Sequence, residues 1–224
     1  MALKEYEKIN DTTFALSQDL KWLEEVLDIR LKSHYEGKEI SIYQCEPPDL
    51  SEDTSYYGQF LNKYQLKKGE RLLLLMAIAP HLKPQILDRF FKKNEIIERG
   101  YTEFGGVKGI QHGGFLPTGE TVAFVLTEGS LGKRVYLNEL FSDQHIFRKL
   151  NVLRLEDSPA HEPLLSGRLV ISQEYLNYLT TGKPFKPRFS EKFPAQEINS
   201  NLGWGDLILD NEVMEEVESI LTWI

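Results

Sequence analysis

The segment with the clearest chemical pattern is a glycine-rich string, Gly114-Phe115-Leu116-Pro117-Thr118-Gly119-Glu120-Thr121. Its spacing is that of a phosphate-binding loop, G-x-x-x-x-G-K-[ST], in which backbone N–H groups surround the phosphates and a lysine contacts them. Glu120 stands where that lysine is required, so its carboxylate would repel phosphates, and Pro117 removes one N–H group. The pattern therefore favours a structural use, in which Thr118 caps a helix and Glu120 lies in its first turn. A nucleotide-binding enzyme that uses Gly114–Thr121 is the alternative.

Histidines and cysteines offer no recognisable metal site. The chain has five histidines and one cysteine, Cys45, and no H-x-x-x-H or H-E-x-x-H pair. Asp157, His161 and Glu162 are close in sequence but fall in a predicted hairpin turn, where a solvated loop is the simpler interpretation. A G-x-S-x-G nucleophile motif is also absent from the sequence. We therefore predict no catalytic, cofactor-binding or metal-ligating residue.

Basic residues gather in the middle of the chain. Residues 61–100 hold 9 basic and 4 acidic side chains, whereas the whole chain has a formal charge of -8. The basic side chains that could form a DNA-binding surface are Lys83, Arg89, Lys92, Lys93, Arg99, Arg154 and Arg168. Because DNA binding needs several phosphate contacts and usually a basic domain, a solvated surface is favoured and nucleic acid is an unlikely partner. A winged-helix DNA-binding module is the alternative function.

The composition is that of a globular protein. Of the 224 residues, 41% are hydrophobic and 27% are charged, which excludes a disordered chain or a disulfide scaffold. A single cysteine and a start without an apolar signal segment predict a cytoplasmic location. The most apolar run, Leu72 to Ala79, is far shorter than the ~20 residues that span a bilayer, so no membrane association is expected.

The first half of the chain predicts helices. After possible capping oxygens in Asp11-Thr12-Thr13, apolar residues at helical spacing predict a helix over 14–34, followed by a loop over 37–54 and a short helix over 56–64. Residues 70–79 are apolar on every side, which predicts a buried helix that ends at Pro80. A second helix is expected from Pro84, so the pair would form a corner similar to a helix-turn-helix.

The second half predicts a helix over 121–126, a β-hairpin that pairs 151–156 with 164–171, and a helix capped by Ser172 and stopped by Gly182. An acidic helix is expected from about Asp210. The predicted fold class is α+β and mostly helical: a winged-helix-like domain with an N-terminal helix and a small β-hairpin wing. We divide the chain into an N-terminal helix and loop (1–54), the winged-helix-like domain (55–200) and a connector (201–224).

Several segments resemble the region that precedes the ATPase core in a group of bacterial AAA+ proteins. They are Glu70–Leu82, Pro84-Gln85, Leu87-Asp88, Phe104-Gly105-Gly106, Gly114–Thr121, Leu164–Gly167 and Trp204–Leu209 with the helix to Ile224. The resemblance covers about residues 15–224, and Gly114–Thr121 is its most specific part.

The resemblance implies a winged-helix-type N-terminal domain followed by an AAA+ module that binds ATP and Mg²⁺, hydrolyses ATP and commonly forms a homo-oligomeric ring. This chain lacks a Walker A lysine and any recognisable ATPase core. It is therefore expected to be an N-terminal piece of such an ATPase, with no cofactor of its own, and its partners would be the AAA+ core of the same polypeptide and a protein substrate or partner. The expected function is to recruit or position that protein.

The surface expected to bind the partner is the glycine-rich loop with Phe104, His112 and Phe115, because loops rich in glycine and aromatic residues suit adaptable contacts. A loop packed on its own side chains is the alternative.

Overall fold

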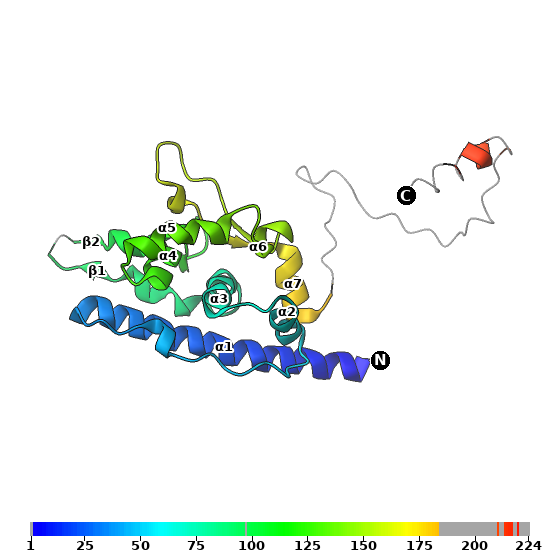
Figure 1. The fold of residues 1–224 in the computed structure, drawn as a ribbon, viewed down its shortest axis with the longest axis horizontal. Coiled ribbons are helices and arrows are strands. Elements are labelled where there is room, and N and C mark those ends of the chain that lie inside the picture. Colours follow the sequence, from blue (N-terminus) through cyan, green and yellow to red (C-terminus); the bar gives the residue numbers. More distant parts are fainter. Residues whose placement is uncertain (1, 97, 184–209, 211–212, 217–218, 220–224) are drawn as a thin grey trace. The chain divides into compact units, whose positions relative to one another are not determined.

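The computed structural model describes residues 2–96, 98–183, 210, 213–216 and 219 (Figure 1). As predicted, the described part is α+β and mostly helical. Its α-helices are α1 (Ala2–Glu36), α2 (Tyr56–Tyr64), α3 (Lys68–Leu82), α4 (Gly119–Thr127), α5 (Leu131–Leu137), α6 (Ile146–Lys149) and α7 (Gln173–Thr181). None of these helices is both long and apolar enough to cross a membrane.

The described strands are short and pair in antiparallel twos. They are β1 (Lys93–Asn94) with β2 (Arg99–Gly100), β3 (Val107–Lys108) with β4 (Phe115–Leu116), and β5 (Leu153–Leu155) with β6 (Leu169–Ile171). The β5–β6 ladder confirms the predicted hairpin, with Arg154 opposite Val170. Short 3-10 helices join these elements: η1 (Ile42–Gln44), η2 (Pro84–Ile86), η3 (Asp88–Phe91), η4 (Thr102–Phe104), η5 (Asn138–Phe141) and η6 (Leu164–Ser166).

The first helix is longer than predicted. It begins at Ala2 rather than near residue 14, and Thr12 and Thr13 lie inside it. Their hydroxyls donate hydrogen bonds to the carbonyls of Lys8 (2.7 Å) and Ile9 (2.9 Å), one turn earlier. Threonine can bond to the i-4 carbonyl in this way, so the capping role predicted for Asp11-Thr12-Thr13 was wrong.

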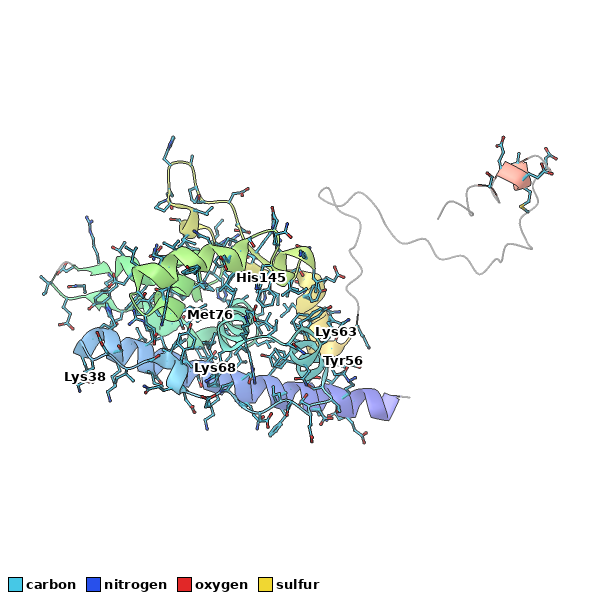
Figure 2. All side chains as sticks on the ribbon, in the orientation of Figure 1. Lys38, Tyr56, Lys63, Lys68, Met76 and His145 are labelled. Carbon is cyan, nitrogen blue, oxygen red and sulfur yellow. The ribbon has the colours of Figure 1, made fainter. Side chains whose placement is uncertain are left out.

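Helix α3 lies at the centre of the fold, with α1 along one side and α4 and α5 on the other (Figure 1). Residues 72–79 are all buried, which confirms the prediction of a helix without a polar face. Met76, labelled in Figure 2, is one of these core side chains. The prediction that Pro80 ends the helix was wrong. The helix runs to Leu82: proline lacks only its own N–H group, and the next turn continues, with the Lys83 N–H donating to the Ala79 carbonyl at 2.9 Å.

The segment after α3 does not form the second helix of the predicted corner. Pro84–Ile86 and Asp88–Phe91 are separate 3-10 turns. These turns direct Ile86, Leu87 and Phe90 into the core, where all three are buried. The chain therefore follows a tighter path here than one straight helix would give, and all three side chains are buried along it.

Helix α7 has the predicted caps. Ser172 Oγ accepts a hydrogen bond from the Tyr175 N–H at 3.2 Å, and Gly182 ends the helix at a φ of +70°. A Cβ at residue 182 would lie 2.1 Å from the Tyr56 ring, so glycine is required here for conformation and for close packing on α2.

Helix α1 packs on α2, α3 and α7 and contributes to the same core as they do. The described residues up to 183 belong to one compact unit, so the predicted boundary after residue 54 does not separate two units. Of the predicted connector (201–224) and its acidic helix, only 210, 213–216 and 219 are described. Residues 213–216 are helical, and the rest of that prediction lies outside the described residues.

A buried polar network joins the first three helices. Asp19 of α1 accepts hydrogen bonds from both Arg71 of α3 and Tyr57 of α2, the latter at 2.7 Å. Arg71 also donates to the Pro48 carbonyl at 3.0 Å. We call Asp19, Tyr57 and Arg71 the buried network. Burial, together with the Asp19 charge, raises the pKa of Tyr57, so its hydroxyl stays protonated and donates.

Candidate functional site

A pocket of about 260 Å³ lies where the end of α3, the loop between β3 and β4, and the β5–β6 hairpin meet. Its polar lining consists of His81, His112, Glu156 and Arg168, and its apolar lining includes Pro80. We call it the His81–His112 pocket.

Close backbone pairing holds the hairpin side of this pocket in place. The Leu169 N–H donates to the Pro117 carbonyl at 2.8 Å, and the Gly119 N–H donates to the Gly167 carbonyl at 3.0 Å. A Cβ at residue 167 would lie 2.0 Å from the Glu156 carbonyl oxygen, so only glycine permits this approach. The glycine-rich loop and the hairpin are therefore fixed to each other beside the pocket.

Glu156 and Arg168 form a bidentate ion pair on this wall. Arg168 Nε and Nη2 donate to the two carboxylate oxygens of Glu156 at 2.6 and 3.0 Å. The hydrogen bonds to Glu156 raise the pKa of Arg168. Because the two charges compensate each other, this wall carries little net charge. Its hydrogen-bonding groups are nevertheless held in a fixed orientation.

His112 contributes the unusual feature of the pocket. Its Nε2 atom is buried and has no hydrogen-bond partner among the described residues. A Cβ at residue 114 would lie 2.8 Å from this nitrogen, so Gly114 gives the ring room. Asp88 holds the loop next to it, since its Oδ1 accepts from the Phe115 N–H at 3.2 Å. A buried polar atom without a partner typically costs about 1–3 kcal/mol. The loop therefore maintains His112 in an energetically unfavourable position.

His81 faces the same pocket from the last turn of α3. Burial lowers its pKa, and a charge on His112 would lower it further. His81 is therefore neutral at pH 7 and offers one N–H donor and one acceptor nitrogen. The pocket thus combines neutral hydrogen-bonding capacity with a compensated ion pair.

The segment with phosphate-loop spacing uses its polar groups inside the protein. Thr118 is the N-cap residue of α4 and Glu120 lies in the first turn, as predicted. Glu120 accepts two hydrogen bonds from Arg134, at 2.8 and 2.6 Å. The Thr118 N–H donates to Thr121 Oγ1 at 3.1 Å, and this hydroxyl donates to the Phe104 carbonyl at 2.8 Å. The N–H groups of Thr118 and Gly119, which a phosphate loop would aim at its ligand, already have acceptors.

The structure separates the three residues predicted to bind a partner. Phe104 and Phe115 are only 1% and 2% exposed, and each packs against Phe90 in the core, with ring centres 5.4 and 5.2 Å apart. These two rings are therefore not accessible to a partner in this structure. For Phe104 and Phe115, this agrees with the alternative interpretation, a loop packed on its own side chains. Of the three, His112 lines a pocket. Ile110, at the tip of the same loop, is the fully exposed apolar residue that the prediction did not single out.

Sequence reasoning did not connect His81, Glu156 or Arg168 with His112, and it considered Arg168 only for DNA binding. They lie in three separate segments, and no motif or spacing links them to His112. Glu156 and Arg168 fall on the two opposite strands of the predicted hairpin, which is the one signal that could have placed them together.

Several basic residues considered for DNA binding have acidic partners. Lys83 pairs with Glu24 at 3.0 Å, Arg89 pairs with Asp28, and Arg168 pairs with Glu156. These pairs reduce the positive charge that these residues can offer to phosphates.

Among the described residues, no group of three or more His, Cys, Asp or Glu side chains could hold a metal ion. Comparisons with known protein families, curated proteins and solved structures found no match. Neither a family nor a structural neighbour therefore assigns a role to the His81–His112 pocket.

Proposed function

We propose that this chain is a non-catalytic interaction domain that recruits or positions a protein partner, and that the His81–His112 pocket is part of the contact. The observation that carries the proposal is the buried His112 Nε2 atom without a hydrogen-bond partner. A partner that supplied a hydrogen bond to the imidazole would relieve a cost that the free domain bears.

The chemistry of the pocket favours binding over catalysis. Glu156 and Arg168 hold each other, so neither is poised to transfer a proton or stabilise a developing charge. The described lining offers imidazole, carboxylate and guanidinium groups but no hydroxyl or thiol nucleophile. Its volume of about 260 Å³ is below the ~300–1,000 Å³ typical of small-molecule sites, which suits one side chain of a partner.

The proposal includes the context that the resemblance implies. The domain would precede an AAA+ module that binds ATP and Mg²⁺ and assembles as a ring in the bacterial cytoplasm, and the module would act on the recruited protein. The architecture proposed for it is winged-helix-like, with β5–β6 as the wing. The packing of β6 against α3 supports this proposal.

Site-specific photocrosslinking tests the proposal in cells that produce the full protein. A benzoylphenylalanine at Ile110, which is fully exposed two residues before His112, is expected to give a discrete crosslinked protein. The same probe at Phe14, which is 65% exposed on α1, is the matched control and is expected not to give that product.

A His112→Leu substitution in the Ile110 probe protein should abolish the product. Identical products from both probe positions, or an unchanged product after His112→Leu, would contradict the proposal. Deletion of residues 104–116 is unsuitable as a test, because it would remove the core rings of Phe104 and Phe115.

A further inference from the structure

A second pocket, of about 200 Å³, lies between α2 and α7, far along the chain from His112. Each helix contributes two aromatic side chains at helical spacing, Phe60 with Tyr64 from α2 and Tyr175 with Tyr178 from α7. Lys63 and Glu174 complete its lining. We call these six residues the aromatic pocket. Lys63 is labelled in Figure 2, on α2 beside α7.

The rings form walls at steep angles to one another and are not stacked. Phe60 and Tyr64 have centres 4.9 Å apart at 60°, Phe60 and Tyr175 are 5.7 Å apart at 65°, and Tyr175 and Tyr178 are 6.3 Å apart at 78°. Differently oriented rings around a small volume offer faces to one group from several sides, whereas parallel rings would leave a slot for a flat ligand. Such an arrangement suits a compact head group better than a flat ligand.

Packing of α2 on α7 accounts for only part of this cluster. Phe60 is fully buried and anchors the contact, and Gly182 lets the end of α7 approach Tyr56. Tyr178, in contrast, is 37% exposed, and Tyr64 and Tyr175 are half-buried. No hydroxyl of these three tyrosines has a hydrogen-bond partner within the described part of the chain. Core packing therefore leaves the accessible aromatic surface unexplained.

The electrostatics of the aromatic pocket select a cation. The faces of aromatic rings are electronegative, and Glu174 adds a carboxylate at the edge. An ammonium group already uses this surface, since Lys63 Nζ lies 5.2 Å from the centre of the Tyr64 ring. Lys63 is itself exposed, so its flexible side chain can withdraw when another cation enters.

From these contacts we infer that the aromatic pocket binds an alkylammonium group, held by the faces of Tyr64, Tyr175 and Tyr178 and by the Glu174 carboxylate. The volume fits a head group and not a whole drug-sized molecule. Two sources share this chemistry, a methylated lysine side chain of a protein and a free quaternary amine. The site is independent of the His81–His112 pocket.

Titration of the full 224-residue chain tests the inference. The probes are choline, its neutral isostere 3,3-dimethylbutanol, and a short peptide with or without one trimethyllysine, and the readout is the NMR shifts of Tyr64, Tyr175 and Tyr178. Choline is expected to bind saturably and about tenfold more tightly than the neutral isostere. Tighter binding of the trimethyllysine peptide than of choline would identify a protein side chain as the source, and the reverse would identify a free amine.

Matched variants connect the binding to the named groups. Tyr178→Ala should weaken choline binding about tenfold and Tyr178→Phe should leave it nearly unchanged, because the ring face and not the hydroxyl holds the cation. Glu174→Gln, at an exposed position, should also weaken binding, whereas Lys63→Met should strengthen it by removing the competing ammonium group. The inference is overturned by equal binding of choline and its isostere, by no saturable shift with any probe, or by unchanged binding in both Tyr178→Ala and Glu174→Gln.

Discussion

The buried network and the His81–His112 pocket both bring ionisable side chains together, but they differ in burial and in how their polar atoms are satisfied. Asp19 is fully buried, whereas the Arg168 side chain in the pocket is 45% exposed. In the buried network, the Asp19 carboxylate accepts from Arg71 and Tyr57, and Arg71 has a further acceptor in the Pro48 carbonyl. In the pocket, His112 Nε2 has no partner among the described residues. Satisfied buried groups hold a fold together, whereas an unsatisfied one is a reason to look for a ligand.

The largest expected effect is in the buried network. Asp19→Ala should lower the free energy of unfolding by about 3–5 kcal/mol, because it leaves the Arg71 charge buried without its partner. The measurement is urea denaturation followed by circular dichroism. Asp28→Ala is the matched control on the same helix: its carboxylate also pairs with an arginine, Arg89, but is 72% exposed, and its loss should cost only about 0–1 kcal/mol. Equal losses in the two variants would remove the distinction between a structural and a surface ion pair.

A second, smaller effect is expected in the segment with phosphate-loop spacing. Thr121→Val removes the hydroxyl that donates to the Phe104 carbonyl and accepts from the Thr118 N–H, so stability should fall by about 1–3 kcal/mol. Thr13→Val is the control, because the Thr13 hydroxyl bonds within an exposed turn of α1 and its loss should change stability by less than about 0.5 kcal/mol. A negligible effect of Thr121→Val would show that this segment does not use its polar groups structurally.

The pocket should also contribute to the pH dependence of stability. Burial, assisted by His112, lowers the folded-state pKa of His81 below 6.5, so the unfolded chain binds the proton first as pH falls. The contribution of His81 is complete above the unfolded-state pKa and declines as pH falls through about 6.5 toward the folded-state value. Urea unfolding at pH 8, 7, 6 and 5 should show a shallower decline in His81→Gln than in the unaltered protein. Identical pH profiles would contradict a lowered pKa of His81 in the folded protein.

The smallest expected change concerns nucleotide binding. Glu120→Lys restores the lysine of the G-x-x-x-x-G-K-[ST] pattern, yet calorimetry with Mg-ATP should detect no saturable binding, because the neighbouring N–H groups already donate within the protein. Glu120→Gln, which removes the charge that pairs with Arg134 without adding a lysine, is the control. Saturable heat with either variant or with the unaltered chain would restore the nucleotide-binding alternative.

The sequence predicted elements whose signals are local. Ser172 and Gly182 indicated the two ends of α7. Residues 72–79 are apolar on every side of the helix, which indicated that α3 is buried. Helix α5 escaped prediction because Leu131 and Val135 face outward, so no apolar stripe points to the core. The second helix from Pro84 was predicted from periodicity that the 3-10 turns satisfy equally well, since both geometries can bury Ile86 and Phe90.

The candidate site could not be predicted as a unit. His112 was singled out because it lies in a glycine-rich loop, but the same reasoning also selected Phe104 and Phe115, which are core residues. Arg168 reaches the pocket through tertiary pairing, in which the chain at Thr118 bridges to Arg168, and His81 reaches it from the last turn of α3. Contacts of this kind depend on the packed fold and leave no spacing signal in the sequence.

The central claim is that His112 serves binding and not stability, and His112→Leu measures both in one protein. We predict a free energy of unfolding that is unchanged or higher, by up to about 1–3 kcal/mol, because leucine replaces a buried polar atom that has no partner. The crosslinked product from the Ile110 probe should be lost at the same time. A loss of stability as large as that of Thr121→Val, with the crosslinked product retained, would contradict the account.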